Sequence, residues 1–358
     1  MNKILDLSKK LLERWRQGNR NLSALKAGKN LKPKGIWFGV TDRCNSHCTH
    51  CHIWQKAPSL NPLKLEEIEK AFRDPLLSEV EFIVNSGGEA LLRADIVELI
   101  KLESKLFPGV ILDLSTNGLL PDRAIAVVKE ILQAGIKINV GVSLDGLGDE
   151  HDKVRGVPGN FAKVDYLLNQ LNLLRKEYPI LLRPLIGFTL SDLTIDSYQG
   201  VKDYASKLGV ECMPQWYNQS DFYDNSISRP EASKEKMVAA VKNQPNTIIR
   251  EKWLRLLNGK SIKFKCFAAQ TFFVLKADGQ VAPCLSFWDS NFGNVREQTP
   301  TEIWQSAKAD EVRKLVASCP GCLNSWGVTW SISAAFYPWL WFYLRQPKAI
   351  WERLKRKD

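Results

Sequence analysis

Three closely spaced cysteines occur early in the chain, at Cys44, Cys48 and Cys51 in the pattern C-x3-C-x2-C. Three thiolates on one tight loop can hold three irons of a cubane 4Fe–4S cluster, because soft sulfur ligands suit iron–sulfur clusters. A cluster with three protein ligands leaves its fourth iron open to a small molecule. The alternative is zinc, which takes four protein ligands in structural sites. The fourth zinc ligand would be a histidine of the same stretch: His47, His50 or His52.

A second set of cysteines lies in the C-terminal part of the chain: Cys266, Cys284, Cys319 and Cys322. The segment 272–284 predicts a β-hairpin that turns at Asp278-Gly279. Four thiolates are enough for one fully ligated 4Fe–4S cluster or for one structural zinc ion, and both remain open. The eighth cysteine, Cys212, lies in a predicted strand, where we expect it to be buried by packing.

Composition indicates a globular protein: the chain has 358 residues, of which 44% are hydrophobic and 25% charged. No apolar segment with a cleavage site begins it, so we expect a cytoplasmic protein whose cysteines serve metal binding or catalysis. The net charge of +11 comes from the ends. Residues 1–34 carry ten Lys/Arg against two acids, and residues 345–358 carry six against two. The basic character therefore describes the terminal surfaces, and no motif supports nucleic-acid binding.

Strands and helices alternate from Gly35 onward. Strands are predicted at 36–41, 80–84, 110–115, 137–143, 181–189 and 210–216. Helices are predicted at 65–72, 94–106, 122–134, 161–176 and 195–208. Six strands separated by helices predict an α/β fold with a parallel sheet, a partial (β/α)6 TIM-like barrel. Sites in such folds lie at the carboxyl ends of the strands, where the first cysteine loop is expected.

Polar and glycine-rich motifs follow the later strands in order. They are Asn85-Ser86-Gly87-Gly88-Glu89-Ala90, Ser115-Thr116-Asn117-Gly118, Ser143-Leu144-Asp145-Gly146 and His151-Asp152-Lys153-Val154-Arg155. Adjacent glycines let the backbone approach a ligand, and a guanidinium matches a carboxylate. On the fifth strand, Ile186-Gly187-Phe188 is a candidate to pack an adenine. Each motif alone can be an ordinary turn or a surface ion pair. Together, each after a strand, they indicate one ligand site.

The cysteine loop and these motifs resemble the radical S-adenosylmethionine (radical SAM) superfamily, over residues 35–216. The resemblance implies that Cys44, Cys48 and Cys51 hold a 4Fe–4S cluster and that S-adenosylmethionine binds its open iron. Reductive cleavage would then give a 5′-deoxyadenosyl radical, which abstracts a hydrogen atom from the substrate. The family's Gly-Gly-Glu-Pro motif has Ala90 here in place of proline. The implied cofactor contacts are Gly87, Gly88, Glu89, Ser115, Asn117, Ser143, Arg155 and Ile186.

The C-x12-G-x4-C spacing from Cys266 to Cys284 resembles the start of the SPASM and Twitch extensions of radical SAM enzymes. A full SPASM domain has more cysteines and two auxiliary clusters, so this chain is closer to Twitch or to a reduced SPASM domain. The resemblance implies a second 4Fe–4S cluster held by Cys266, Cys284, Cys319 and Cys322. Such a cluster has no open iron, and its role would be to accept or pass an electron. A helix is predicted at 302–316 within this segment.

Both ends of the chain are basic and partly apolar. Residues 3–17 predict an amphipathic helix that either packs on the protein or lies on an anionic membrane. Residues 323–344 contain no charge and eight aromatic residues, and basic residues follow. This tail predicts either an aromatic cap on the protein or a contact with membrane.

We therefore expect four segments: a basic amphipathic helix at 1–34, a radical SAM partial barrel at 35–245, a SPASM/Twitch-like iron–sulfur domain at 246–324, and an aromatic, basic tail at 325–358. The expected function is a radical SAM enzyme that acts on a small or lipid-linked metabolite. A peptide maturase and a non-catalytic metal-binding protein are the alternatives. A separate leader-peptide domain is not expected, because 34 residues are too few.

A flavodoxin- or ferredoxin-type protein would donate electrons. The sequence identifies no catalytic acid or base. Gln215, Trp216 and Tyr223 are candidates by position alone.

Overall fold

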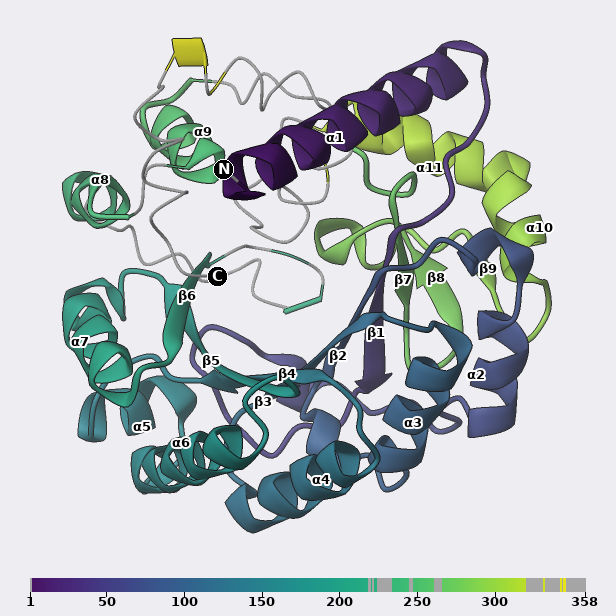
Figure 1. Ribbon diagram of the computed structural model, residues 1–358. Helices are drawn as coiled ribbons and strands as arrows, with labels where there is room; N and C mark the ends of the chain where they lie inside the picture. The colour runs from purple at the N-terminus through teal and green to yellow at the C-terminus, as the bar shows by residue number, and fades with distance from the viewer. Residues whose placement is uncertain are drawn as a thin grey trace.

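The computed structural model describes residues 2–217, 220, 222–223, 234–244, 247–260, 266–319, 331, 342 and 344–345. Within these residues the strands form one nine-stranded sheet in the order β6-β5-β4-β3-β2-β1-β7-β8-β9 (Figure 1). Neighbouring strands among the first six are parallel. These six are β1 (Gly35–Thr41), β2 (Phe82–Gly87), β3 (Ile111–Thr116), β4 (Ile138–Ser143), β5 (Leu182–Leu190) and β6 (Glu211–Trp216).

Helices along the outer, convex side of the sheet connect these strands (Figure 1). They are α2 (Leu65–Phe72), α3 (Ile96–Leu106), α4 (Pro121–Gln133), α6 (Asn160–Glu177) and α7 (Tyr198–Leu208). A short helix that the sequence did not predict, α5 (Asp149–Arg155), precedes α6. The predicted α/β partial barrel is confirmed, and most predicted bounds differ from the observed ones by one or two residues.

Side chains alternate between the two faces of the sheet, as the strand period requires. On β3, Leu112 and Leu114 are 1% exposed and belong to the core against the helices. Asp113 and Ser115 point to the opposite side, which we call the inner face. The main core therefore lies between the sheet and α2–α7, and the inner face is left for polar residues and ligands.

The C-terminal cysteine segment extends the sheet of the barrel. Strand β7 (Phe272–Leu275) pairs in parallel with β1, and β8 (Gln280–Ala282) pairs antiparallel with β7. The predicted hairpin is confirmed, and its turn uses Gly279 at φ +88°, a conformation that favours glycine. Strand β9 (Gly293–Asn294) completes the sheet beside β8. Strand β1, which precedes the first cysteine loop, and the hairpin between Cys266 and Cys284 are thus parts of one continuous sheet.

The helix predicted at 302–316 is observed as two helices, α10 (Pro300–Gln305) and α11 (Ala307–Ala317). The break occurs at Ser306, which has extended backbone and whose hydroxyl accepts from the N–H of Ala309. A serine that caps in this way begins a new helix.

Helix α1 (Asn2–Lys26) is longer than predicted. Its last turns pack on the protein, because Ala24 and Leu25 contact Leu31 and Phe267. Farther toward the N-terminus, Leu12 and Trp15 are 46% and 44% exposed. Two further helices are α8 (Lys234–Lys242) and α9 (Ile248–Leu257). No helix among the described residues has the length and apolar character needed to cross a membrane. The predictions for Cys322 and for nearly all of the tail fall outside the described residues.

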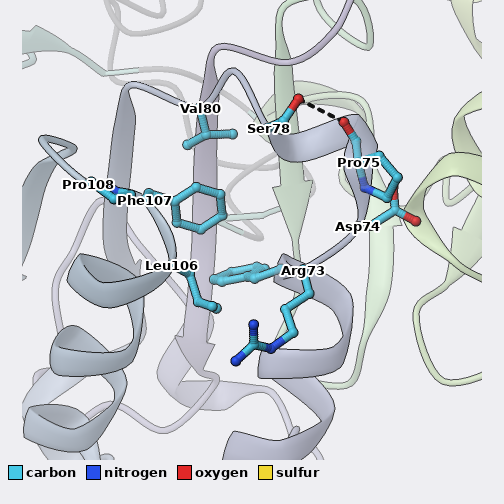
Figure 2. Close-up of a pocket in the computed structure, with 9 residues that line it drawn as sticks. Arg73, Asp74, Pro75, Ser78, Val80, Leu106, Phe107 and Pro108 are labelled. Carbon is cyan, nitrogen blue, oxygen red and sulfur yellow. Dashed lines mark hydrogen bonds between the residues drawn. The ribbon is translucent and has the colours of Figure 1, made fainter.

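A pocket of about 320 Å³ lies at the edge of the sheet where β2 and β3 begin (Figure 2). Its lining comes from the ends of α2 and α3 and the turns that follow them: Phe72, Arg73, Asp74, Pro75, Ser78, Val80, Leu106, Phe107 and Pro108. None of the predicted site residues is among them, because those follow the carboxyl ends of the strands.

Candidate functional site

The Gly-Gly pair after β2 holds the start of the cysteine loop. A Cβ on Gly87 would lie 2.3 Å from the carbonyl oxygen of Thr41, and one on Gly88 would lie 2.1 Å from that of Arg43. Gly88 N–H donates to Thr41 (2.8 Å), and Glu89 N–H donates to Arg43 (2.7 Å). Glycine is therefore required here by the close approach of two backbones within the protein.

Glu89 connects this turn to the turn after β3. Its side chain is 1% exposed and accepts from the Thr116 hydroxyl (2.8 Å) and from the N–H groups of Asn117 (2.7 Å) and Leu91 (3.2 Å). Burial raises the pKa of this carboxyl, against the hydrogen bonds that lower it. A carboxylate offers about four acceptor positions, so about one remains for a ligand.

Asn117 in turn reaches the cysteine loop. Its amide Nδ2 donates to Asn45 (2.8 Å) and lies 4.0 Å from the sulfur of Cys44. The Asn117 side chain thus positions the cysteine loop, and its predicted contact with the cofactor stays a prediction.

Helix α5 holds the middle of the cysteine loop. The carbonyl oxygen of Arg155 accepts from the N–H of His47 and the hydroxyl of Ser46, both at 3.1 Å. The Arg155 side chain reaches Cys48, with Nη1 3.8 Å from its sulfur. The hydroxyl of Ser46 lies 3.2 Å from the same sulfur.

Asp145 holds the Arg155 guanidinium in place. Its Oδ2 lies 2.7 Å from Arg155 Nη2, and the two side chains are 0% and 8% exposed. Its Oδ1 accepts from the N–H of Thr189 (2.7 Å). Burial opposes the arginine charge, but the net effect lowers the pKa of Asp145. The sequence motif contained Asp145, yet nothing in the sequence indicated which charge it would meet.

Two buried histidines complete this network. His50 Nε2 lies 4.0 Å from Asp145 Oδ2, and His151 Nδ1 accepts from the N–H of Asp145 (3.1 Å). Burial lowers the pKa of each histidine to about 4, so both are neutral at pH 7. His47 packs instead against Trp54, with ring centroids 4.7 Å apart.

The loop cysteines suit an anionic cluster. Burial raises the pKa of Cys44 to about 11 and that of Cys51 to about 12, so the free thiols are protonated at neutral pH. The free energy of metal coordination must therefore offset the cost of deprotonating them. The groups near the sulfurs of Cys44 and Cys48 are donors, an amide, a hydroxyl and a guanidinium. No set of three His, Cys, Asp or Glu side chains within the described part of the chain is arranged for a single metal ion.

One buried donor remains for a ligand carboxylate. Arg155 Nε is fully buried, and no acceptor for it lies within the described residues. An unpaired buried donor is costly, and a carboxylate is the partner that a guanidinium matches best. This observation fits the α-carboxylate of S-adenosylmethionine beside Cys48.

The other predicted contacts divide between the two faces of the sheet. Ser115 and Ser143 lie on the inner face, next to Gly141 and Gly187 in the register. Ile186 is 0% exposed and lies in the helix-side core. It shares its face with Phe188, whose ring contacts Tyr198 of α7 at 5.0 Å. The strand period therefore turns the Ile186 side chain toward the helices, and the predicted contact of this stretch with an adenine stays a prediction for its backbone and for Gly187 on the inner face.

Of the positional candidates, only Gln215 is open to solvent, at the end of β6. Trp216 is buried against Trp253 at 5.4 Å, and the carbonyl of Tyr223 accepts from the N–H of His52 at 2.7 Å. Tyr223 packs against the same hydrophobic cluster as Cys44 and Cys51, and catalytic roles for the three candidates stay predictions. Cys212 packs partly buried against the main core, as expected.

The second cysteine set lies close to the first. Cys266 and Cys284 pack against the same hydrophobic cluster as Cys44 and Cys51. The centre of this cluster is aromatic, with the ring of Trp37 5.1 Å from Phe222 and 5.6 Å from Trp288. Burial raises the pKa of Cys266, and Cys319 is near enough to contribute to that shift. The pairing of β7 with β1 therefore brings the two predicted clusters to one apolar region.

Comparison with known families agrees with this geometry. Residues 38–193 match the Radical SAM superfamily, and residues 266–323 match the SPASM iron–sulfur cluster-binding domain. The chain is a radical SAM protein with a SPASM-type domain. The two domains imply two 4Fe–4S clusters and S-adenosylmethionine as cofactors, and they confirm the predicted family and fold. Both matched ranges lie within the segments predicted for them.

Relatives of this radical SAM protein have different named activities. Fe-coproporphyrin III synthase of Methanosarcina barkeri is 40% identical over 139 residues, 38% of this chain and 33% of its own length. AdoMet-dependent heme synthase of the same organism is 26% identical over 340 residues, 81% of this chain and 88% of its own length.

The solved structure of Streptococcus suis SuiB bound to S-adenosylmethionine superposes with a TM-score of 0.65 at 15% identity. It covers 84% of this chain and 71% of SuiB, and SuiB has also been solved with its precursor peptide SuiA. The likeness to SuiB shows a shared fold.

Proposed function

We propose that this protein is an enzyme that cleaves S-adenosylmethionine reductively and abstracts a hydrogen atom from a carbon of its substrate. Cys44, Cys48 and Cys51 would hold the cluster, which would supply the electron for cleavage of S-adenosylmethionine to methionine and a 5′-deoxyadenosyl radical. The observation that carries the proposal is the convergence of three turns, after β2, β3 and β4, on one cysteine loop at the carboxyl edge of the sheet.

The protein's own groups divide the work of holding the cofactor. Glu89, with about one acceptor position left, receives the ammonium group. Arg155 presents its unpaired Nε to the carboxylate. Ser115 and Ser143, on the inner face, are placed for the ribose. Gly87 and Gly88 act through the loop that they hold against β2.

The auxiliary cluster is held by Cys266, Cys284, Cys319 and Cys322 in this proposal. Its place beside Trp37 and Trp288 supports electron transfer with the substrate site, since both cysteine sets border one apolar cluster. A flavodoxin- or ferredoxin-type donor reduces the first cluster.

Replacement of Cys48 by Ala tests the assignment. The variant should form no 5′-deoxyadenosine under anaerobic, reducing conditions, whereas Cys212→Ala should retain the wild-type rate because Cys212 packs in the core. Iron and sulfide analysis should find about eight irons per wild-type chain, two cubanes' worth. A Cys48→Ala protein that still forms 5′-deoxyadenosine would exclude the proposal, and a wild-type chain without iron would favour a non-catalytic role.

The substrate is proposed to be a small or lipid-linked metabolite, and the peptide alternative is favoured only by the fold shared with SuiB. The exposed apolar pair on α1 supports a membrane contact. Leu12 and Trp15 lie three positions apart on one face, and Arg16 and Arg20 are nearby in the sequence.

Liposome flotation tests this contact. Trp15→Ser should lower binding to vesicles that contain anionic lipid, and Leu193→Ser, a change of an exposed leucine in the loop between β5 and α7, should not. Equal flotation of the wild type and Trp15→Ser would exclude a role of α1.

A further inference from the structure

A row of polar side chains crosses the inner face of the sheet. It lies nearer the starts of β3 and β4 than Ser115 and Ser143, which we place beside the cofactor. Asp113 of β3 is paired in register with Asn139 of β4, and Asn139 with Arg183 of β5. Asn139 Nδ2 donates to Asp113 Oδ1 at 2.5 Å. Ser115 is the next inner-face residue along β3, so it lies roughly 7 Å farther along the strand.

As far as the described residues show, the space above this row is open. A Cβ on Gly187 would meet no atom within 4 Å, and one on Gly141 would meet only the carbonyl oxygen of Leu114, at 3.9 Å. On the same face, Ile111 and Met213 are 47% and 42% exposed. The inner face from β3 to β6 can therefore be reached by a molecule that also lies against Ser115 and Ser143.

The negative charge of the row, on Asp113, is less exposed than the positive charge, on Arg183. Arg183 Nη2 lies 2.5 Å from Glu211 Oε2, and this pair is more than half exposed at the β5–β6 edge. Among the described side chains, the hydrogen bond to Asp113 is the one from Asn139 to Oδ1. Burial raises the pKa of Asp113 to about 6, and the hydrogen bond from Asn139 and the charge of Arg183 oppose the rise. At neutral pH Asp113 is thus a partly buried carboxylate, and Arg183, the cation of the row, is paired with Glu211.

We propose that Asp113, oriented by Asn139, binds a protonated amine of the substrate on the inner face of the sheet. This rests on the proposed function, because the amine would fix the substrate below the cofactor. A cation is favoured over a neutral donor because the three side chains of the row and Glu211, the ion-pair partner of Arg183, together carry one net negative charge. The open strip over Gly141 and Gly187 accommodates the rest of the substrate toward Ser143.

Saturation-transfer NMR on the anaerobic, cofactor-loaded full chain tests the site with n-butylammonium as the probe and n-butanol as its neutral counterpart. Butylammonium should bind to the wild type, and butanol should bind about tenfold more weakly, since its hydroxyl can donate to Asp113 but carries no positive charge to pair with the carboxylate. Asp113→Asn should weaken butylammonium binding by a similar factor. Asp203→Asn is the matched control, because Asp203 also accepts from a side-chain amide, that of Gln199, but lies on the outer helix α7.

The proposal is overturned if butylammonium does not bind to the wild type, if butanol binds equally well, or if Asp113→Asn leaves the affinity unchanged. Formation of 5′-deoxyadenosine without added substrate is measured in the same samples. Wild type and Asp203→Asn should cleave S-adenosylmethionine at equal rates. If neither does, the proposed function fails, while the binding result still decides the role of Asp113.

Discussion

Replacement of Asp145 by Asn should destabilise the protein strongly. The amide oxygen of asparagine can still accept from Thr189, so the substitution removes mainly the charge that faces Arg155. Both members of the pair are buried, at 0% and 8% exposure, and the guanidinium would be left without its counter-charge. Removal of one partner from a buried ion pair costs about 3–5 kcal/mol of the free energy of unfolding.

Urea denaturation of the reconstituted protein, followed by tryptophan fluorescence, measures this loss. The control is Asp196→Asn, which breaks an ion pair with Lys236 whose side chains are 74% and 55% exposed and should cost at most about 1 kcal/mol. Since Arg155 holds the pKa of Asp145 below its usual value near 4, the stabilisation is present at neutral pH and lost as the pH falls below that value. The difference in the free energy of unfolding between wild type and Asp145→Asn should therefore decrease below about pH 4. Equal losses for the two variants at pH 7 would refute the reasoning.

Two further predictions concern residues around the site. Burial raises the pKa of Glu103 to about 8, and Asn85 Nδ2 donates to its carboxyl group at 2.7 Å. As the pH rises from 5 to 8, the wild type should therefore lose stability relative to Glu103→Gln. Denaturation at a series of pH values should show a loss in the free energy of unfolding of up to about 1.4 kcal/mol per pH unit. A pH-independent difference would contradict a buried, protonated Glu103. Gly88→Ala places a methyl group against the carbonyl oxygen of Arg43 and should lower iron bound per chain by about four, one cubane. Gly200→Ala in α7, with its nearest contact at 3.6 Å, should retain all the iron, and full iron in Gly88→Ala would show that the loop can shift.

The elements of the barrel could be predicted from the sequence because their signals are local. Apolar runs such as 36–41 and 181–189 are typical of strands buried on both faces, and the helices between them have amphipathic spacing. The order of the motifs after these strands placed them at one edge, since parallel strands end on the same side. The turn at Gly279 was likewise a local signal.

The roles of single side chains depended on contacts between residues far apart in the sequence. Arg155 meets Asp145 and Cys48, and Gly88 meets Arg43, only after β1, β2 and β4 have assembled. Ile186 shows the limit most clearly, because its identity suits either face of β5 and only the register and the packing of α7 turn it to the helices.

The sequence alone determined the spacing of the cysteines and the strand ends that the polar motifs follow, because spacing and strand order are properties of the chain. Only the tertiary structure decided that β7 pairs with β1, and so that Cys44 and Cys51 share one apolar cluster with Cys266 and Cys284. Pairing between strands more than 200 residues apart is set by packing of the whole sheet, for which no local pattern exists.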